Sequence, residues 1–515
     1  MKKNSFLYEI TLNLIITLLI SISSFLLNKY FTNYLGMKNL GMMKLFTQLL
    51  AYLNLAEIGL ASASTYALYK PLAEKNYKQI SIVINTITSL YNKIFLFILI
   101  IGLSLSPMIP FFIKDKIIDK NIYLYWSLYV ISTALNYSFV KYSVLFTADQ
   151  KFGFVRLVQG GSKIFCQLLQ ILVIIKLQSF LIFILLLILD NVIQYIFYKI
   201  HYKKYYLYIY KTEVKDKSIT KNLKNLFWHK IAGLIVFNTD LILISKFISL
   251  EIVGIYASYQ MVIQMIMTII NIVLNVLRPK IGKYIAENKK EKIFYYWKNL
   301  NILFLFVSIL FSFCTYKLVN DFVILWLGKQ FVLTIFSVKL IMANFFVLCF
   351  RGITDIFKDG SGFFDDIYLP ILEAMINFVI SIILVNYMGL NGVIIGTIVS
   401  NILIICIAKP ILVFKRCFNK ELKGYIKTYG NYLILITISL LSCNFIMKFI
   451  TVKNINSWFD WIINGITVGS ITFIVIFIIF LSNADFRRIM CFKQLKLIGE
   501  KNECNNNSSR NRNKT

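Results

Sequence analysis

Charged and amide side chains stand inside long apolar stretches of this 515-residue chain, where they could meet an anion or carry a proton. Lys163 lies near the middle of the stretch 153–175, with Gln159 and Gln167 four residues to either side. Residues four apart share one face of a helix, so the three predict a polar stripe. A charge in hydrocarbon costs about 2.5–3.5 kcal/mol, which makes each such residue a candidate for function.

Other cations stand in these stretches or near their ends. They are Arg156, Lys141, Lys230 and Lys339. Each of these cations is costly at such a depth and is a candidate for function. Two structural alternatives stay open: an internal ion pair for Lys163, and extension of Lys141, Arg156 and Lys230 to the lipid headgroups.

Three carboxylates are candidates for ion coupling: Glu57, Asp190 and Asp240. Removal from water favours the neutral form of a carboxyl group, so a buried one can bind and release protons near neutral pH. The alternative roles are structural. Asp240 could be a partner for a lysine or cap a helix, and Glu57 could contact a neighbouring helix.

The elements that position these side chains must be membrane helices. The chain is 58% hydrophobic and only 15% charged, too little charge for the surface of a soluble protein of this length. About 20 apolar residues cross a bilayer as a helix, and about fourteen stretches qualify. The predicted spans are 10–29, 45–66, 90–113, 121–146, 153–175, 178–198, 226–247, 254–276, 296–318, 333–350, 367–388, 392–412, 430–450 and 459–481. A start nearer Ile80 is the alternative for the third span. The predicted fold class is an all-α membrane protein.

The net charge of +31 comes from cations in the gaps between spans. With the N-terminus inside, most Lys and Arg fall in predicted cytoplasmic loops such as 199–225, 278–298 and 409–429. The loop 351–366 is the exception, because its Asp residues outnumber its Lys and Arg. This distribution predicts a multi-pass protein with both termini in the cytoplasm, and it excludes a nucleic-acid partner.

Two segments resemble each other at an offset of 213 residues: Leu40-Gly41-Met42 matches Val253-Gly254-Ile255, and 70–80 matches 283–293. The repeat pairs span two with span eight, so spans 1–6 match spans 7–12 in the same membrane orientation. The predicted domains are an N-lobe (1–198), a basic cytoplasmic linker (199–225), a C-lobe (226–412), two further spans (413–481) and a cytoplasmic, disordered tail (482–515).

Other kinds of site find little support. The eight cysteines have neither CxxC pairs nor metal-ligand spacing, and there are two histidines. No ATP-binding signature is present. No cofactor, metal site or catalytic residue is predicted. A polymerase or glycosyltransferase would need a large catalytic loop, and the predicted outer loops are short, so the chain is not expected to be an enzyme.

Several fragments in order along the chain resemble the polysaccharide-export (Wzx-type) flippases of O-antigen. They are Leu55–Leu60, Tyr69–Glu74, Thr239–Ile242, Val253–Tyr256, Trp326–Lys329 and Gly389–Val393. The resemblance implies the fold of the multidrug/oligosaccharidyl-lipid/polysaccharide exporters: two six-helix lobes in a V shape, here with two C-terminal helices. One departure concerns the first span, which lacks the arginines of the related peptidoglycan-precursor flippases.

The resemblance also implies the cargo. It is an oligosaccharide linked through pyrophosphate to a polyprenol, such as the repeat unit of lipopolysaccharide O-antigen or a capsule, moved from the inner to the outer leaflet of the bacterial cell (inner) membrane. Membrane lipids, a polysaccharide polymerase and a chain-length regulator are the expected partners. The alternatives are a cation-coupled multidrug exporter and a polytopic polymerase. The sequence does not name the glycan, the driving ion or the oligomeric state.

Overall fold

Every regular element of the computed structural model is helical within the residues that it describes, which are 3–57, 59–115, 120–216, 239–363, 366, 368–449 and 455–490. The α-helices are α1 (Lys3–Leu35), α2 (Met37–Leu53), α3 (Leu60–Ala73), α4 (Tyr77–Ser104), α5 (Ile122–Ala148), α6 (Phe152–Leu177), α7 (Phe180–Tyr205), α10 (Asp240–Phe247), α11 (Leu250–Glu287), α12 (Lys290–Trp326), α13 (Ile335–Gly360), α14 (Tyr368–Met388), α15 (Leu390–Asn401), α16 (Lys409–Arg416), α17 (Leu422–Ile446), α18 (Trp458–Phe480) and α19 (Ala484–Met490). Short 3-10 turns (η1, Asn54–Glu57; η2, Ser106–Phe112; η3, Lys329–Phe331) and one π-helical turn (η4, Ile402–Ala408) connect some of them.

Eleven helices of the described chain are long and apolar enough to cross a membrane. Many of their large apolar side chains point outward, as on α1, where Ile15, Leu18 and Ile22 are about half exposed. A water-soluble protein would bury such a belt, whereas lipid covers it in a bilayer. The prediction of an all-α membrane protein is confirmed.

Several predicted span edges are wrong. The span 45–66 is two helices, α2 and α3, separated by a break at residues 54–59. The third span starts closer to the alternative, Ile80, than to residue 90, because α4 begins at Tyr77. Three predicted cytoplasmic loops are largely helical: α11 and α12 take up most of 278–298, α13 continues to Gly360, and α16 and α17 occupy much of 409–429. Most of the seventh predicted span lies outside the described residues. Lys230 also lies outside them.

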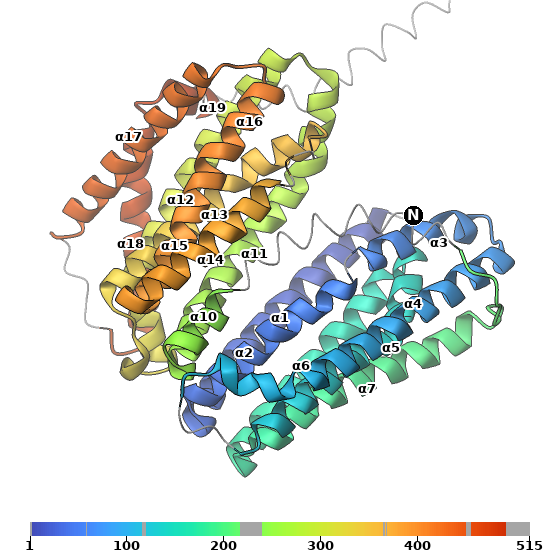
Figure 1. Cartoon of the computed structure of the whole chain (residues 1–515). Helices are drawn as coiled ribbons and strands as arrows, with labels where there is room; N and C mark the ends of the chain where they lie inside the picture. The colour runs from blue at the N-terminus through green and yellow to red at the C-terminus, as the bar shows by residue number, and fades with distance from the viewer. Residues whose placement is uncertain are drawn as a thin grey trace, which may run out of the picture. The chain divides into compact units, whose positions relative to one another are not determined.

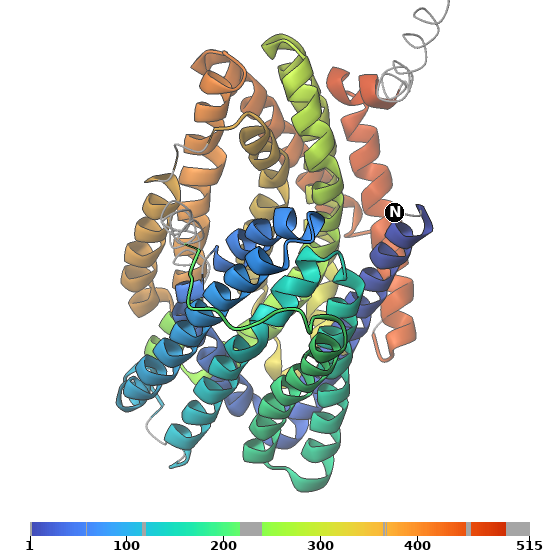
Figure 2. The ribbon, with the colours of Figure 1, turned by 90° about the vertical axis from the view of Figure 1, so that its right-hand side faces the viewer.

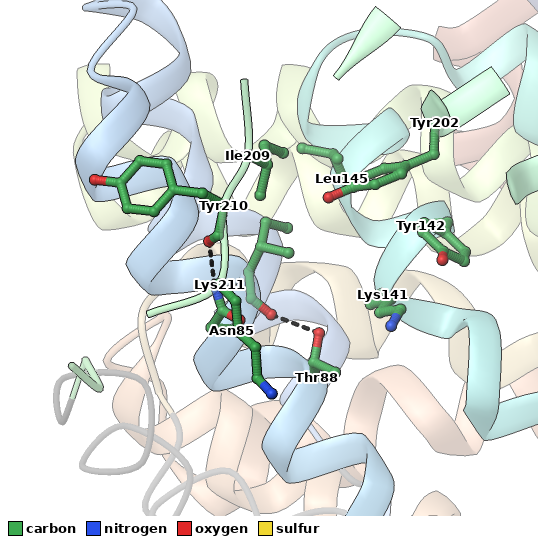
Figure 3. A pocket seen from close by; sticks show the side chains of 10 residues that line it. Asn85, Thr88, Lys141, Tyr142, Leu145, Tyr202, Ile209, Tyr210 and Lys211 are labelled. Atoms are coloured by element: carbon green, nitrogen blue, oxygen red, sulfur yellow. Dashed lines mark hydrogen bonds between the residues drawn. The ribbon is translucent and has the colours of Figure 1, made fainter. Parts of the chain in front are cut away.

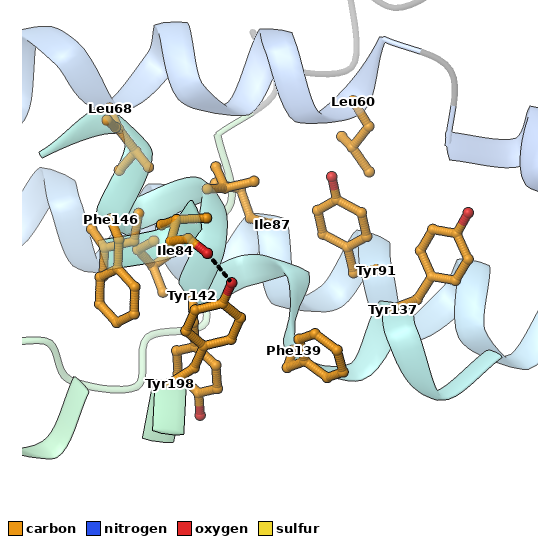
Figure 4. Packing of buried hydrophobic residues seen from close by; sticks show 14 of the residues in the cluster. Leu60, Leu68, Ile84, Ile87, Tyr91, Tyr137, Phe139, Tyr142, Phe146 and Tyr198 are labelled. Carbon is orange, nitrogen blue, oxygen red and sulfur yellow. Dashed lines mark hydrogen bonds between the residues drawn. The ribbon is translucent and has the colours of Figure 1, made fainter. Parts of the chain in front are cut away.

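Contacts divide the chain into two compact units, unit 1 (Met1–Met261 with Ala374–Gly396) and unit 2 (Val262–Glu373 with Thr397–Thr515). In unit 1, α1 to α7 run side by side (Figures 1 and 2). One core of this unit joins α3, α4, α5 and α7, with tyrosines such as Tyr91, Tyr137 and Tyr198 among the aliphatic side chains (Figure 4). These rings supply apolar area together with a hydroxyl that can donate a hydrogen bond within the membrane.

The register between α1 and α6 shows the direction of both helices. Arg156 bonds to Asn13, Gly160 packs on Ile16, and Gln167 bonds to Ser23. The residue numbers rise together on both helices, so α1 and α6 are parallel. These helices correspond to the first and fifth predicted spans. Two spans with three membrane crossings between them must be parallel, so the observed direction agrees with the predicted order.

Unit 2 is built around α12, which packs against α13, α17 and α18. Its core contains Phe306, Phe480 and Phe486, and Phe486 belongs to the short helix α19. Lys298 forms an ion pair of 2.6 Å with Asp485 of the same short helix. The predicted disordered tail is therefore wrong for residues 484–490, because one aromatic anchor and one ion pair hold them on the bundle.

Helix boundaries support the internal repeat. Met37 and Leu250, which begin α2 and α11, are 213 residues apart, and so are Tyr77 and Lys290, which begin α4 and α12. Exposed ion pairs recur at the same offset, Lys70–Glu74 at 3.8 Å and Lys283–Glu287 at 3.7 Å. The fold thus contains two copies of one helical pattern.

The two matched glycines, Gly41 and Gly254, meet each other inside unit 1. A Cβ atom on Gly41 would lie 3.1 Å from the nitrogen of Gly254, and a Cβ atom on Gly254 would lie 3.1 Å from the nitrogen of Gly41. The contact is reciprocal, as it is where equivalent residues of two copies face each other. Only glycine permits this approach, since the Gly41 Cβ would also lie 1.7 Å from the carbonyl oxygen of Leu250.

Candidate functional site

The first candidate site is a pair of lysines in unit 1, Lys163 on α6 and Lys44 on α2. Lys163 is exposed, Lys44 is half-buried, and each lies within electrostatic range of the other. Neither forms an ion pair with a carboxylate of the described residues. The structure therefore gives no support to the internal ion pair that was the alternative for Lys163. Two unneutralised cations at neighbouring positions of a membrane unit can accept an anion.

Lys44 did not stand out in the sequence because the predicted span began at residue 45. The helix begins at Met37, since Gly36 interrupts the chain with a backbone φ of 84°. Lys44 is therefore well inside α2 rather than in a loop. The signal that could have found it is the helical spacing of Leu40, Lys44 and Gln48 across the predicted edge.

The polar stripe predicted on α6 does not face a single direction. Gln167 is buried against α1, where it accepts from the Ser23 hydroxyl at 2.5 Å and donates to the Ser24 hydroxyl at 2.8 Å. Gln159 is half-buried and contacts the hydroxyl of Tyr198 on α7. Each four-residue step turns a helix by about 40°, so the outer members of the stripe reach different neighbours while Lys163 stays exposed.

Arg156 also has a packing contact. Its guanidinium donates to Asn13 Oδ1 at 2.5 Å and to Thr17 Oγ1 at 2.8 Å, both on α1. Both acceptors are neutral, and no carboxylate among the described side chains forms an ion pair with this guanidinium. Arg156 thus links two parallel helices and keeps a cation on α6 two turns before Lys163.

A second pair of lysines lies in unit 2. Lys339, near the start of α13, is exposed and within electrostatic range of Lys317 on α12. The ammonium of Lys317 lies over the rings of Phe313 and Tyr316, at 5.4 and 5.3 Å from their centroids. Each unit of the molecule therefore carries one pair of neighbouring lysines on different helices.

The three predicted coupling carboxylates accept hydrogen bonds from neutral donors in unit 1. Tyr91 donates to Glu57 Oε1 at 3.2 Å, Tyr256 donates to Asp240 Oδ2 at 3.2 Å, and the amide of Gln194 donates to Asp190 Oδ1 at 3.2 Å. Glu57 lies at the break between α2 and α3, where Tyr137 also contacts it. These bonds favour the structural reading for Glu57, a contact with neighbouring helices.

Unit 2 contains a charge cluster that the sequence did not reveal. Arg351 Nε donates to Asp355 Oδ2 at 2.8 Å, and Lys409 Nζ donates to Asp355 Oδ1 at 2.7 Å. Glu373 is buried within electrostatic range of both cations, and its Oε1 accepts no hydrogen bond from the described residues. Two acids and two bases thus meet inside one helical unit.

This cluster was missed because three of its members were assigned to loops. Arg351 and Asp355 are four residues apart on α13, and Lys409 opens α16 directly after the π-helical turn η4. Internal neutralisation lowers the cost of burying these charges, so the helices continue past the polar residues that seemed to end them.

Lys141 lies apart from the lysine pairs, beside a pocket at the end of unit 1. Lys230 is outside the described residues. No group of three or more His, Cys, Asp or Glu residues that could hold a metal occurs within the described ranges.

Comparisons with known proteins identify the fold. No protein-family model matches the chain, and no curated protein matches it. The solved structure of the lipid II flippase MurJ in an inward closed conformation is similar, with 13% identity over 92% of this chain and 99% of that chain and a TM-score of 0.67.

Two multidrug resistance MATE family transporters of the MOP superfamily are also similar. The inward-facing structure has 12% identity over 76% of this chain and 93% of its own, with a TM-score of 0.61. The outward-facing structure has 14% identity over 78% of this chain and 93% of its own, with a TM-score of 0.52. The chain is therefore a multi-pass membrane protein with the fold of the MOP-superfamily transporters.

Proposed function

We propose that the chain is a flippase for a polyprenyl-pyrophosphate-linked oligosaccharide. It moves the glycan head from the cytoplasmic to the outer leaflet of a bacterial cell membrane by alternating access. The observation that carries this proposal is the presence of an unneutralised lysine pair in each unit, Lys44 with Lys163 and Lys317 with Lys339.

The physical problem of such a cargo is its charge. A pyrophosphate diester bears about two negative charges, and moving them through hydrocarbon without compensation is prohibitive. Each lysine in a span is itself unfavourable by about 2.5–3.5 kcal/mol, and two close together repel each other. An anion between them relieves both penalties, so the pairs are better explained by an anionic cargo than by packing.

The extent of the fold match favours a lipid flippase over a drug exporter. The MurJ structure aligns with 92% of this chain, whereas the MATE structures align with 76% and 78%. The C-terminal helices α17 and α18 are each long and apolar enough to span a membrane, which fits the two spans predicted beyond the duplicated twelve. A cation-coupled multidrug or small-molecule exporter is the second candidate, and the lysine pairs would repel a cationic substrate of such an exporter.

The finer parts of the proposal follow from the same chemistry. Arg156 and Lys163 on α6 and Lys339 on α13 would contact the pyrophosphate, with Lys141, Lys230, Gln159 and Gln167 as the weaker candidates. Asp240 or Asp190 would bind the coupling ion, together with Glu373 of the charge cluster. The polymerase and the chain-length regulator remain proposed partners.

Reconstitution tests the function directly. The purified chain is placed in liposomes with a fluorescent polyprenyl-pyrophosphate oligosaccharide, and a membrane-impermeant glycosidase reports the fraction of glycan that has reached the outside. We expect Lys44→Gln with Lys163→Gln to lower the initial rate at least tenfold. Lys176→Gln is the matched control, because this exposed lysine lies on the same helix outside the pair.

Unchanged rates in the double variant would remove the lysine pair from the mechanism. Transport of an organic cation in place of the glycan, with no exposure of the glycan by the wild-type chain, would favour the exporter. Each variant is compared at equal amounts of folded protein, measured by size-exclusion chromatography in detergent.

A further inference from the structure

The segment that leaves α7 remains bound to unit 1 instead of extending away from it. The backbone nitrogen of Tyr210 donates to Ser81 Oγ at 3.2 Å, and Asn85 Nδ2 donates to the carbonyl oxygen of Tyr210 at 2.8 Å. The nitrogen of Asp216 donates to Thr86 Oγ1 at 2.9 Å. Residues 206–216, named here the docked strap, therefore lie along α4 over about two of its turns (Figure 2).

The beginning of the strap is fixed by a separate polar contact. Tyr206 is buried and donates to Asp149 Oδ2 at 2.5 Å, while Lys151 Nζ lies 3.0 Å from the same hydroxyl. Burial, reinforced by the Asp149 carboxylate, raises the pKa of Tyr206 well above its usual range, so the hydroxyl keeps its proton and donates. The strap is thus held at both ends.

A pocket of about 290 Å³ opens between the strap and the ends of α4, α5 and α7. Figure 3 shows Tyr210 and Lys211 of the strap on one side and Lys141 with Tyr142 of α5 on the other. Asn85 and Thr88 of α4 complete the polar lining. The pocket exists only because the strap supplies one of its walls.

The lining is positive and rich in hydrogen-bond donors. It contains two lysines and no Asp or Glu, and neither lysine forms an ion pair with a carboxylate of the described residues. Tyrosine hydroxyls add neutral donors beside the two ammonium groups, whereas the Asn85 amide already donates to the carbonyl oxygens of Ser81 and Tyr210. Such a set matches the oxygens of a phosphate group, which accepts several charge-assisted hydrogen bonds at once.

The position of the pocket suits a phosphate at the membrane surface. It is formed by the end of α5, the end of α7 and the early turns of α4, all of which face the cytoplasm in the topology that the charge distribution predicts. Tyrosine and lysine together, as at Tyr202 and Lys211, are typical of the headgroup region of a bilayer.

We propose that this pocket binds a phosphate group at the cytoplasmic surface and thereby fastens the strap to unit 1. The ligand would stabilise the docked state of the strap. The phosphate can belong to the headgroup of an anionic phospholipid or to a soluble phosphate. The proposal is independent of the transported cargo.

Hydrogen exchange of the backbone amides tests the site in the full-length chain. The protein is placed in nanodiscs of phosphatidylcholine alone or of phosphatidylcholine with phosphatidylglycerol, and a third sample in phosphatidylcholine receives inorganic phosphate. We expect phosphatidylglycerol to slow exchange at residues 209–216 at least fivefold. The double variant Lys141→Gln with Lys211→Gln should lose this protection.

The matched control is Lys203→Gln with Lys215→Gln, which removes two exposed lysines of the same region that do not line the pocket. The single variant Lys211→Gln controls for misfolding of the double variant, because the Lys211 side chain is exposed and its loss removes no packing. Protection by phosphatidylglycerol but not by inorganic phosphate identifies a lipid headgroup, and protection by both identifies a soluble phosphate. Equal exchange in all three samples, or equal loss in the control variant, would overturn the proposal.

Discussion

Residues 37–74 and 250–287 are two copies of one helical pattern, yet they fold differently. The second copy is the continuous helix α11, whereas the first is interrupted between α2 and α3 by the short turn η1 and Gly59. Both copies start at equivalent positions and end within one residue of equivalent positions, so the interruption changes the middle of the element and leaves its ends in place. A difference confined in this way points to local side chains as its cause.

The residues at the break explain it. The first copy has Asn54, Glu57 and Gly59 where the second has Met267, Ile270 and Ile272. Gly59 adopts a φ of 80°, a left-handed conformation that a side chain disfavours. Ile270 is instead 4% exposed and packs as an ordinary apolar residue of a continuous helix.

Tyrosine hydroxyls bind the polar side chains that stand at the break. Tyr91 donates to Glu57 at 3.2 Å, and Tyr137 donates to Asn54 Oδ1 at 3.0 Å. The two copies therefore differ in polarity at this point: the first copy has polar side chains that hydroxyls of α4 and α5 bind, and α11 has apolar residues at the equivalent positions.

The largest expected effect comes from the contact between the two copies. Gly41→Ala would place a Cβ atom 1.7 Å from the carbonyl oxygen of Leu250, so α2 and α11 must move apart. We expect a loss of about 3 kcal/mol of stability, measured as a lower unfolding temperature in detergent. Gly254→Ala should cost less, since its nearest contact would be 2.6 Å. Gly161→Ala, with open space around its Cβ, is the control, and an equal effect there would contradict the close approach.

The next effect separates the broken copy from the continuous one. Gly59→Ala should destabilise the chain by about 1–2 kcal/mol, because alanine disfavours the left-handed conformation. Gly282→Ala, inside α11 with no atom within 4 Å of its Cβ, should stabilise it by about 0.5–1 kcal/mol. Unfolding temperatures of both variants measure the contrast. Stabilisation by both substitutions would mean that the first copy tolerates a continuous helix.

A smaller effect concerns the side chains that support the break. Tyr137→Phe and Tyr91→Phe each remove one hydrogen bond and should cost about 1 kcal/mol. Tyr129→Phe is the control, since that buried hydroxyl on α5 has no hydrogen-bond partner among the described residues. The control should be neutral or slightly stabilising. A loss equal to that of Tyr137→Phe would show that the hydroxyls at the break contribute nothing special.

The smallest effect is expected where the copies are alike. Lys70→Ala and Lys283→Ala each break an exposed ion pair between residues four apart on a helix. Each should cost about 0.3–0.5 kcal/mol, and the two costs should be equal and should fall with added salt. A loss above about 1 kcal/mol for one of them would reveal a contact that the repeat does not share.

The sequence predicted the elements better than their ends. Apolar length found the spans, and the parallel register of α1 and α6 agrees with their predicted order. The cytoplasmic side that the charges predict stays a prediction. Edges failed where charged residues continue a helix, as at Lys44, Arg351 and Lys409. A hydropathy window treats a charge as an end, whereas a partner such as Asp355 lets the charge remain inside.

The sequence identified individual candidate residues but did not show which of them lie together in one site. Lys163 and Lys339 were found, but each proved to have a neighbouring lysine, Lys44 or Lys317, that the sequence placed elsewhere or passed over. Gln167 looked like a companion of Lys163 and is a packing contact with α1. Helix rotation of a few tens of degrees decides such cases, and sequence spacing does not fix it.

By itself, the sequence determined the membrane location, the all-helical class and the duplicated pattern, because these depend on the length and composition of each stretch. Only the tertiary structure decided which cations are neutralised, where the first copy breaks and how the strap builds a pocket. Those outcomes depend on contacts between residues far apart in the chain, and the cost of a buried charge is set by what lies across from it.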